Sequence, residues 1–292
     1  MNPQRKGYTY VLIATICGSL VYLFSKAALN HISLPQFGFW WFLIALFWNS
    51  LMAAHPRGGF NISTFTRRDY KALLLIGIFE VIATVAFYSA INIADNPSVP
   101  SFLRNLEYLF VTLLGVWLLS ERFNKWTGAG GLLILSGAFI ISFRESGLNG
   151  FMTATALMML ISTVFYAIRT ILVKKHIGEI SPVVLALNRA VLIFLVALAF
   201  LLGTGDSILI PRVAFLNILA GSFVGPFLTS IFQYSALRYI QASHAAIVQS
   251  TTGLFVLMGA LLMFGSLPSH IQITGGLVTI AGVALMMKSR KK

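Results

Sequence analysis

A short segment of this chain places charged side chains where apolar ones are expected. Residues 101–110 read SFLRNLEYLF and carry Arg104, Asn105 and Glu107 inside a long apolar stretch. Because Arg104 and Glu107 are three residues apart, a helix would put them on one face, where pairing lowers the cost of burying each charge. One interpretation is a structural ion pair, with Asn105 adding a hydrogen bond. The other is a site where a carboxylate or phosphate competes for Arg104 while Glu107 takes up a proton.

A second acidic residue, Glu80, lies in the middle of another apolar stretch. No basic residue stands three or four positions to either side of it, so the sequence gives it no local partner. Burial away from water disfavours a charged carboxylate, which makes Glu80 a candidate for proton uptake and release. The structural alternative is a neutral glutamic acid bonded to a carbonyl group of a neighbouring helix.

Three more cations fall within apolar stretches: Lys26, Arg169 and Arg189. Lys26 and Arg169 lie near the ends of their stretches, and we expect each to extend its charged end to the interface while burying only its stem. If these cations face the protein interior instead, they favour an anionic or zwitterionic ligand. Arg189 is a candidate binding residue on that ground.

The composition indicates that these residues lie within a lipid bilayer. Of 292 residues, 58% are hydrophobic and only 10% are charged, whereas a soluble domain averages about 25% charged. A helix needs roughly 20 apolar residues to cross a bilayer core of about 30 Å. Ten such spans are predicted, near residues 8–29, 34–54, 70–93, 98–119, 126–143, 151–173, 181–203, 212–237, 242–264 and 270–287.

The basic residues indicate an orientation for these spans. With the N-terminus in the cytoplasm, 15 of the 21 Lys and Arg residues fall inside, two outside and four within spans. This distribution follows the positive-inside rule. We therefore expect a multi-pass protein of the cytoplasmic membrane with both termini cytoplasmic. The net charge of +13 reports this topology, and no nucleic-acid partner is expected.

The two halves of the chain resemble each other. Tyr88-Ser89-Ala90 matches Tyr234-Ser235-Ala236 at an offset of 146, and the glycines of 130–137 match those of 275–282 at an offset of 145. Each half holds five predicted spans, an odd number, so the second half enters the membrane from the opposite side. The prediction is two inverted repeats, residues 1–146 and 147–292, as in many secondary transporters.

These motifs resemble the EamA-type members of the drug/metabolite transporter superfamily. The resemblance covers the whole chain: a Tyr-x-Ala-Leu-like end of span 3, a fourth span closing in Leu-Leu-Ser-Glu-Arg, and a Gly-rich fifth span. It implies an all-α membrane protein with ten helices around a central cavity, lined mainly by spans 1, 3, 4, 6, 8 and 9. It places spans 5 and 10 at the periphery, often at dimer contacts, so a homodimer is a candidate assembly.

The sequence departs from the family pattern in two spans. Members commonly have a proline in the middle of spans 4 and 9, where this chain has Tyr108 and Gly253. Proline frees a carbonyl group and permits a kink. Without it, we expect span 4 to be straighter. Pro226, after Gly225 in span 8, indicates instead a hinge or a cavity-lining segment.

Polar and aromatic residues on the expected cavity spans complete the candidate site. With Arg104, Asn105, Glu107, Glu80 and Arg189, the candidate substrate-binding residues are Tyr22, Tyr88, Tyr166, Gln233, Tyr234 and Gln249. Tyr88 and Tyr234 occupy equivalent repeat positions, so packing of the shared fold explains them equally well. Glu80 and Glu107 are the proton-coupling candidates.

These features favour a secondary active transporter of a small metabolite, acting by alternating access as an exporter or exchanger. An amino acid or another zwitterionic or anionic compound is the expected substrate class. No cofactor or metal is expected, because no phosphate-binding loop, Asp-rich motif or His-Glu-x-x-His pattern occurs. The alternative is a membrane-embedded enzyme acting on a lipid or prenyl substrate.

Overall fold

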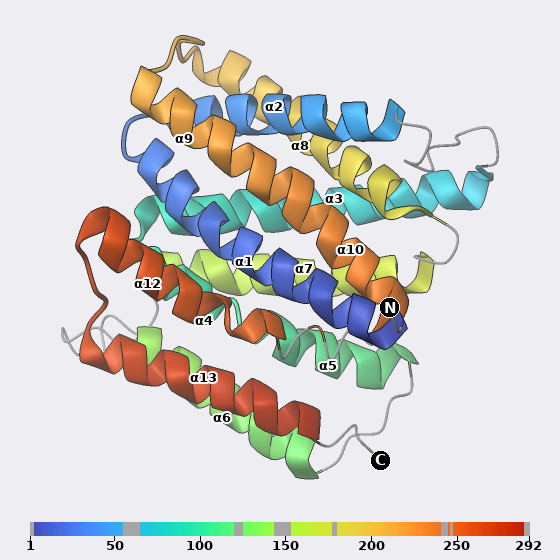
Figure 1. Ribbon diagram of the computed structural model, residues 1–292, viewed down its shortest axis with the longest axis vertical. Helices are drawn as coiled ribbons and strands as arrows, with labels where there is room; N and C mark the ends of the chain where they lie inside the picture. Colours follow the sequence, from blue (N-terminus) through green and yellow to red (C-terminus); the bar gives the residue numbers. More distant parts are fainter. Residues whose placement is uncertain are drawn as a thin grey trace.

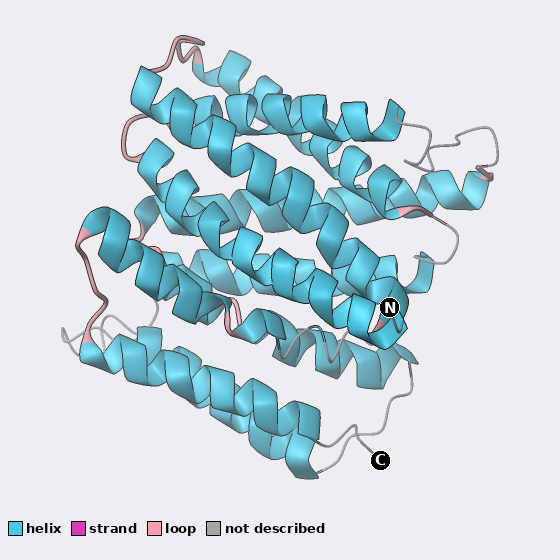
Figure 2. Cartoon of the chain, viewed as in Figure 1, coloured by secondary structure: helices cyan, strands magenta, loops and turns pink. Residues whose placement is uncertain are grey.

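All regular secondary structure among the described residues of the computed structural model is helical, with loops and turns between the helices (Figure 2). The described residues are 3–54, 65–119, 125–142, 153–176, 180–240, 245 and 248–288. Within them, six helices are long and apolar enough to cross a membrane. These are α1 (Pro3–Leu29), α2 (Leu34–Ala54), α3 (Arg67–Ile93), α7 (Ala154–His176), α8 (Pro182–Thr204) and the continuous segment Arg212–Tyr239. The all-α class and the membrane character of the prediction are confirmed.

Shorter helices occupy the other four predicted spans. They are α4 (Ser98–Leu103), α5 (Leu106–Leu119), α6 (Lys125–Ser142), α12 (Thr252–Phe264) and α13 (His270–Lys288). The segment Arg212–Tyr239 is itself divided into α9 (Arg212–Ser222), a π-helical segment η4 (Phe223–Thr229) and α10 (Ser230–Tyr239). Some of the basic residues that predict the orientation lie outside the described residues, among them Arg57, Arg122, Arg144, Arg290, Lys291 and Lys292.

Local signals in the sequence fix several helix ends. A capping box starts α3, where the Thr66 backbone N–H donates to Asp69 at 2.8 Å and the Thr66 side chain accepts from the Asp69 backbone. Ser181 caps α8 by accepting from Val184 N at 3.3 Å. Helices α8 and α12 both end at a glycine with positive φ, 70° at Gly205 and 63° at Gly265, where a side chain would be strained.

The fourth span is broken rather than straight, so the expectation from the missing central proline is wrong. Helix α4 ends at Leu103 and α5 begins at Leu106. Around the break, backbone hydrogen bonds join residues three apart instead of four, from Asn105 N to Phe102 O and from Glu107 N to Arg104 O. The Asn105 amide holds the break in place by donating to Thr279 Oγ1 of α13 at 2.8 Å.

A similar interruption occurs in the ninth span. A turn at Thr251 separates the helical residues 248–250 from α12. Thr251 follows Asn105 by 146 residues, which is within one residue of the offsets of 145 and 146 at which the two halves of the sequence match. The two helix interruptions therefore lie at corresponding positions of the two halves.

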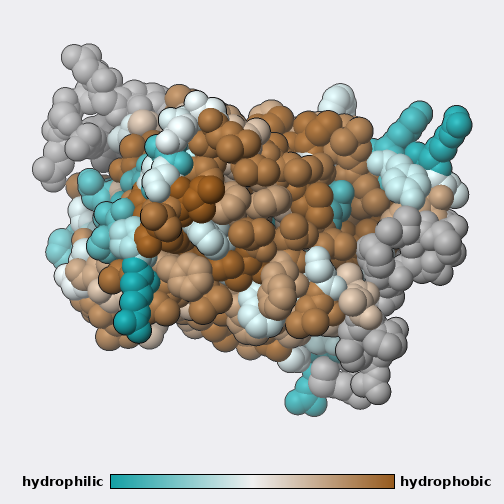
Figure 3. All heavy atoms as spheres, turned by 90° about the horizontal axis from the view of Figure 1, so that it is seen from above, coloured by the Kyte–Doolittle hydropathy of each residue, from teal (hydrophilic) through white to brown (hydrophobic). Residues whose placement is uncertain are grey.

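The helices form one bundle in which α1 runs through the middle (Figure 1). It packs against α9, η4, α10 and α12, while α2 and α8 pack together at one edge and α6 and α13 at the other. The first turn of α1 and the last turn of α13 lie at the same end of the bundle (Figure 1). On the face drawn in Figure 3, hydrophobic side chains cover a broad middle band and hydrophilic ones gather toward both ends.

Small residues allow α6 and α13 to approach closely. A Cβ atom on Gly137 would lie 2.6 Å from the backbone oxygen of Gly275, and one on Gly282 would lie 2.8 Å from that of Gly130. The contact is reciprocal: each helix gives one glycine and one backbone carbonyl at matched positions. Only glycine fits here, as expected where membrane helices meet backbone to backbone.

Candidate functional site

A cavity lies in the middle of the bundle. Residues of α1, α3, α5, α7, η4 and α10 line it, together with Arg104 and residues of the ninth span. These are the spans expected to face a central cavity. Helix α8, in the seventh span, contributes Arg189 in addition. Pro226 of η4 is in the wall, as the sequence indicated for this proline.

Glu80 is paired with two arginines that the sequence could not bring to it. Its Oε2 lies 2.8 Å from Arg169 Nε and its Oε1 lies 3.0 Å from Arg189 Nε. The carboxylate is buried, with 1% of its side chain exposed. Three helices, α3, α7 and α8, therefore meet in one ionic cluster in which each carboxylate oxygen has its own guanidinium.

The expectation that Arg169 extends to the membrane interface is wrong. Its side chain is 1% exposed and points into the bundle, because it continues a polar face of α7. That face includes Ser162, Tyr166 and Thr170 at spacings of three and four residues. Arg169 Nη1 is buried without a hydrogen-bond partner among the described residues, and Arg169 lines the cavity. Lys26 instead donates to Asn92 O at 3.1 Å, near the end of α3.

Arg189 connects the cluster to the eighth span. Its Nη1 donates to Ser230 Oγ of α10 at 2.8 Å, and its side chain is 13% exposed. The neighbouring Asn188 donates to Leu73 O of α3 at 3.0 Å. Helix α8 is thus held to α3 and α10 by polar contacts.

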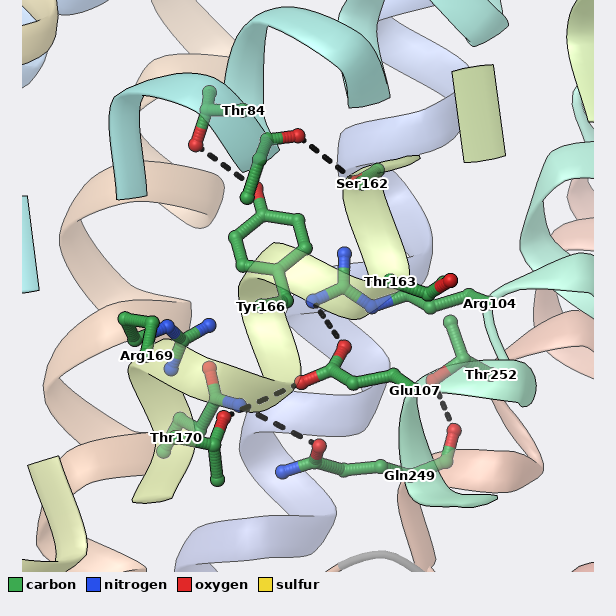
Figure 4. Close-up of polar contacts among 12 residues, drawn as sticks. Thr84, Arg104, Glu107, Ser162, Thr163, Tyr166, Arg169, Thr170, Gln249 and Thr252 are labelled. Atoms are coloured by element: carbon green, nitrogen blue, oxygen red, sulfur yellow. Dashed lines mark hydrogen bonds and ion pairs between the residues drawn. The ribbon is translucent and has the colours of Figure 1, made fainter. Parts of the chain in front are cut away.

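Arg104 and Glu107 form the ion pair that their spacing predicted. Arg104 Nη2 lies 3.1 Å from Glu107 Oε2, and the two side chains point toward one another in Figure 4. The guanidinium carbon lies 4.5 Å from the ring centroid of Tyr166 and 5.2 Å from that of Phe87. Aromatic faces attract a cation at such distances. The Arg104 side chain is 20% exposed and lines the cavity, whereas Glu107 is 4% exposed.

The other candidate residues separate into cavity-lining and structural ones. Tyr22, Tyr88 and Tyr166 line the cavity, and the Tyr166 hydroxyl is 2.9 Å from Thr84 Oγ1 (Figure 4). Tyr234 is buried in a hydrophobic cluster and is not among the lining residues, although its ring centroid lies 5.9 Å from the guanidinium carbon of Arg169. Asn105 is directed to α13 and likewise does not line the cavity.

A second, smaller cavity adjoins the first. Tyr108, Gln233 and Gln249 line both cavities, and Gln233 Nε2 donates to Gln249 Oε1 at 3.5 Å. The remaining lining residues of the smaller cavity are Glu107, Val111, Thr170, Leu237 and Ala245. Leu237 lies in the last turn of α10, next to the first turns of α1, so the smaller cavity lies toward that end of the bundle.

Several lining residues were not among the candidates from the sequence: Thr15, Tyr108, Arg169 and Thr252. For Arg169 the polar face of α7 carried a usable signal. Thr252 follows the turn at Thr251, which nothing in the sequence marks. Among the described residues, no three His, Cys, Asp or Glu side chains lie close enough to hold a metal ion.

Apolar helices of membrane-spanning length around a charged central cavity define a helical membrane protein of the transporter type. The chain belongs to the EamA-like transporter family, whose model matches residues 5–143 and 153–288. The resemblance inferred from the repeated motifs is confirmed.

Two relatives agree with this assignment, and one solved structure is similar in fold. The chain is 25% identical over 228 residues to YdfC, an uncharacterized transporter of Bacillus subtilis (strain 168), covering 74% of this chain and 71% of that protein. It is 22% identical over 219 residues to an uncharacterized transporter of Archaeoglobus fulgidus, covering 75% and 69%. A solved structure described as "Crystal structure of protein" superimposes with a TM-score of 0.69, at 14% identity over 99% of both chains. That likeness shows a shared fold.

Proposed function

We propose that this protein is a secondary active transporter that carries a small anionic or zwitterionic metabolite across the cytoplasmic membrane. The observation that carries the proposal is the charge around the central cavity. Three guanidinium groups, of Arg104, Arg169 and Arg189, face the two carboxylates of Glu80 and Glu107. One positive charge is in excess in a site surrounded by apolar helices, so a ligand with one carboxylate or phosphate group would complete the balance.

Alternating access between two inverted repeats is the proposed mechanism, with residues 1–146 and 147–292 as the repeats. The reciprocal contacts of Gly137 with Gly275 and of Gly282 with Gly130 support it, since a pseudo-twofold axis generates such pairs. The matched helix interruptions at Asn105 and Thr251 support it as well. Export or exchange is the proposed direction.

The positive-inside distribution supports a location in the cytoplasmic membrane with both chain ends in the cytoplasm. Lys174, Lys175 and Arg238 stand near the same end of the bundle as the first turns of α1. The exposed apolar faces of α6 and α13 lie in lipid, and a homodimer through this edge is compatible with the arrangement.

Transport by the purified protein in liposomes tests the proposal. We expect counterflow of labelled amino acids and monocarboxylates, without ATP, to be saturable for at least one compound. Arg104→Met should reduce that counterflow at least about tenfold, because the cavity loses its most exposed cation. The matched control is Gly203→Ala, at a position with no atom within 4 Å of an added Cβ.

Two outcomes would count against the proposal. Counterflow that Arg104→Met leaves unchanged would remove the charged cavity from the transport path. Chemical conversion of a lipid or prenyl compound by the purified protein, seen by mass spectrometry, would favour the enzyme alternative.

A further inference from the structure

The ion pair between Arg104 and Glu107 bridges two separate cavities. Arg104 lines the central cavity, whereas Glu107 lines the smaller one. The wall between the cavities is formed by side chains that line both, Tyr108, Gln233 and Gln249. A ligand in the central cavity therefore reaches the cation of this pair and not its carboxylate, and a small ion or water in the second cavity reaches only the carboxylate.

Glu107 has one strong partner to lose. Its Oε2 lies 3.1 Å from Arg104 Nη2, and its Oε1 accepts from Thr170 Oγ1 at 3.4 Å. If an anion takes the Arg104 guanidinium, Glu107 keeps only the hydroxyl contact. A buried carboxylate without a cation is costly, and taking up a proton removes the charge.

We propose that binding of an anion at Arg104 displaces Glu107 and that Glu107 then takes one proton through the smaller cavity. This inference rests on the proposed function and assigns its coupling residue. Before binding, the Arg104 guanidinium pairs with the Glu107 carboxylate. Afterwards it pairs with the ligand carboxylate, and Glu107 is a neutral carboxylic acid. One proton accompanies each anion, and no other charge moves.

The groups that face Glu107 do not prevent the ligand from replacing it at Arg104. Arg169 of α7 and Tyr22 of α1 act on it electrostatically, along with the adjoining Tyr108, and α10 contributes the uncharged Gln233. Arg169 is itself paired with Glu80, through its Nε at 2.8 Å. Glu80 lines neither cavity and has a cation at each carboxylate oxygen, so it is not assigned this proton uptake.

Calorimetric titration of the purified protein with benzoate tests the proposal, with neutral benzamide as the control ligand. Benzoate supplies one carboxylate and a ring suited to the aromatic wall. Titration in buffers of different ionisation enthalpy gives the number of protons taken up. We expect about one proton per benzoate, and therefore a Kd that rises about tenfold per pH unit over the pH range in which that proton is taken up. Benzamide should bind without proton uptake.

Variants at position 107 make the test specific. Glu107→Gln resembles the protonated state, so benzoate should bind it more tightly at high pH, without proton uptake and with a flat pH dependence. Glu107→Asp, which keeps a titratable carboxylate, should retain the uptake. Wild-type protein that binds benzoate without a proton, or Glu107→Gln that retains the uptake, would overturn the proposal. Failure of both to bind benzoate would also overturn it, whereas saturable transport of another compound in liposomes would leave the proposed function standing.

Discussion

Each oxygen of the Glu80 carboxylate contacts a cation from a different helix, Arg169 of α7 and Arg189 of α8. These partners follow Glu80 by 89 and 109 residues, so no local spacing rule could reveal them. The sequence indicated that Glu80 is buried and that it is not paired within its own helix, and both are correct. What it left out was the rotation of α7 and α8 about their axes, which directs their cations toward α3.

Replacement of Glu80 by glutamine should destabilise the protein strongly. The guanidinium groups of Arg169 and Arg189 would lose the carboxylate that both contact, and breaking a buried ion pair costs about 3–5 kcal/mol. We expect a lower Tm for Glu80→Gln in detergent, measured by scanning fluorimetry. Glu107→Gln is the matched control and should lower the Tm less, since its partner Arg104 is 20% exposed and keeps contact with water. Equal Tm values for Glu80→Gln and wild type would contradict a structural role for the cluster.

At the scale of the elements, the sequence located the helices well and their interruptions poorly. Predicted span ends agree with α2 and α3 within a few residues, because the apolar length needed to cross a bilayer is fixed. The break between α4 and α5 was missed. It depends on Asn105 binding Thr279 and on Phe102 lying against Gly253 and Gly276, contacts with residues about 150 to 170 positions away.

A bulky side chain at Gly137 should separate α6 from α13. The Cβ atom would lie 2.6 Å from Gly275 O, so the helix backbones would have to move apart, at a cost of about 1–3 kcal/mol or more. We expect Gly137→Leu to lower the Tm and the yield of monodisperse protein in size-exclusion chromatography. Gly203→Ala, with open space around its added Cβ, should change neither. Tolerance of leucine at 137 would show that this packing is not needed.

For the whole molecule, the distribution of basic residues predicts which end of the bundle faces the cytoplasm. The first turn of α1 and the last turn of α13 share one end, and the loop that contains Ser207 lies at the other (Figure 1). The sequence predicts this topology more completely than it predicts the residues of the candidate site. Composition and charge set the number and direction of spans, whereas the cavity wall depends on which face of each helix turns inward.

Labelling from outside the cell tests this orientation. In a Cys17→Ala background, Ser207→Cys should react with a membrane-impermeant maleimide added to intact cells, because the loop faces outward. A fluorescent protein fused to the C-terminus should fluoresce, as it does when folded in the cytoplasm. Labelling of Ser207→Cys only after the cells are opened would reverse the proposed orientation.

The π-helical segment η4 gives the eighth span an unusual mechanical property. Its bonds span five residues instead of four, and Asn49 of α2 donates to Pro226 O at 3.3 Å within it. Conversion of η4 to α-helical geometry would advance α10 by one residue, a rotation of about 100° with a rise of about 1.5 Å. That screw motion would carry Gln233 away from Gln249, and these are two of the three residues that line both cavities.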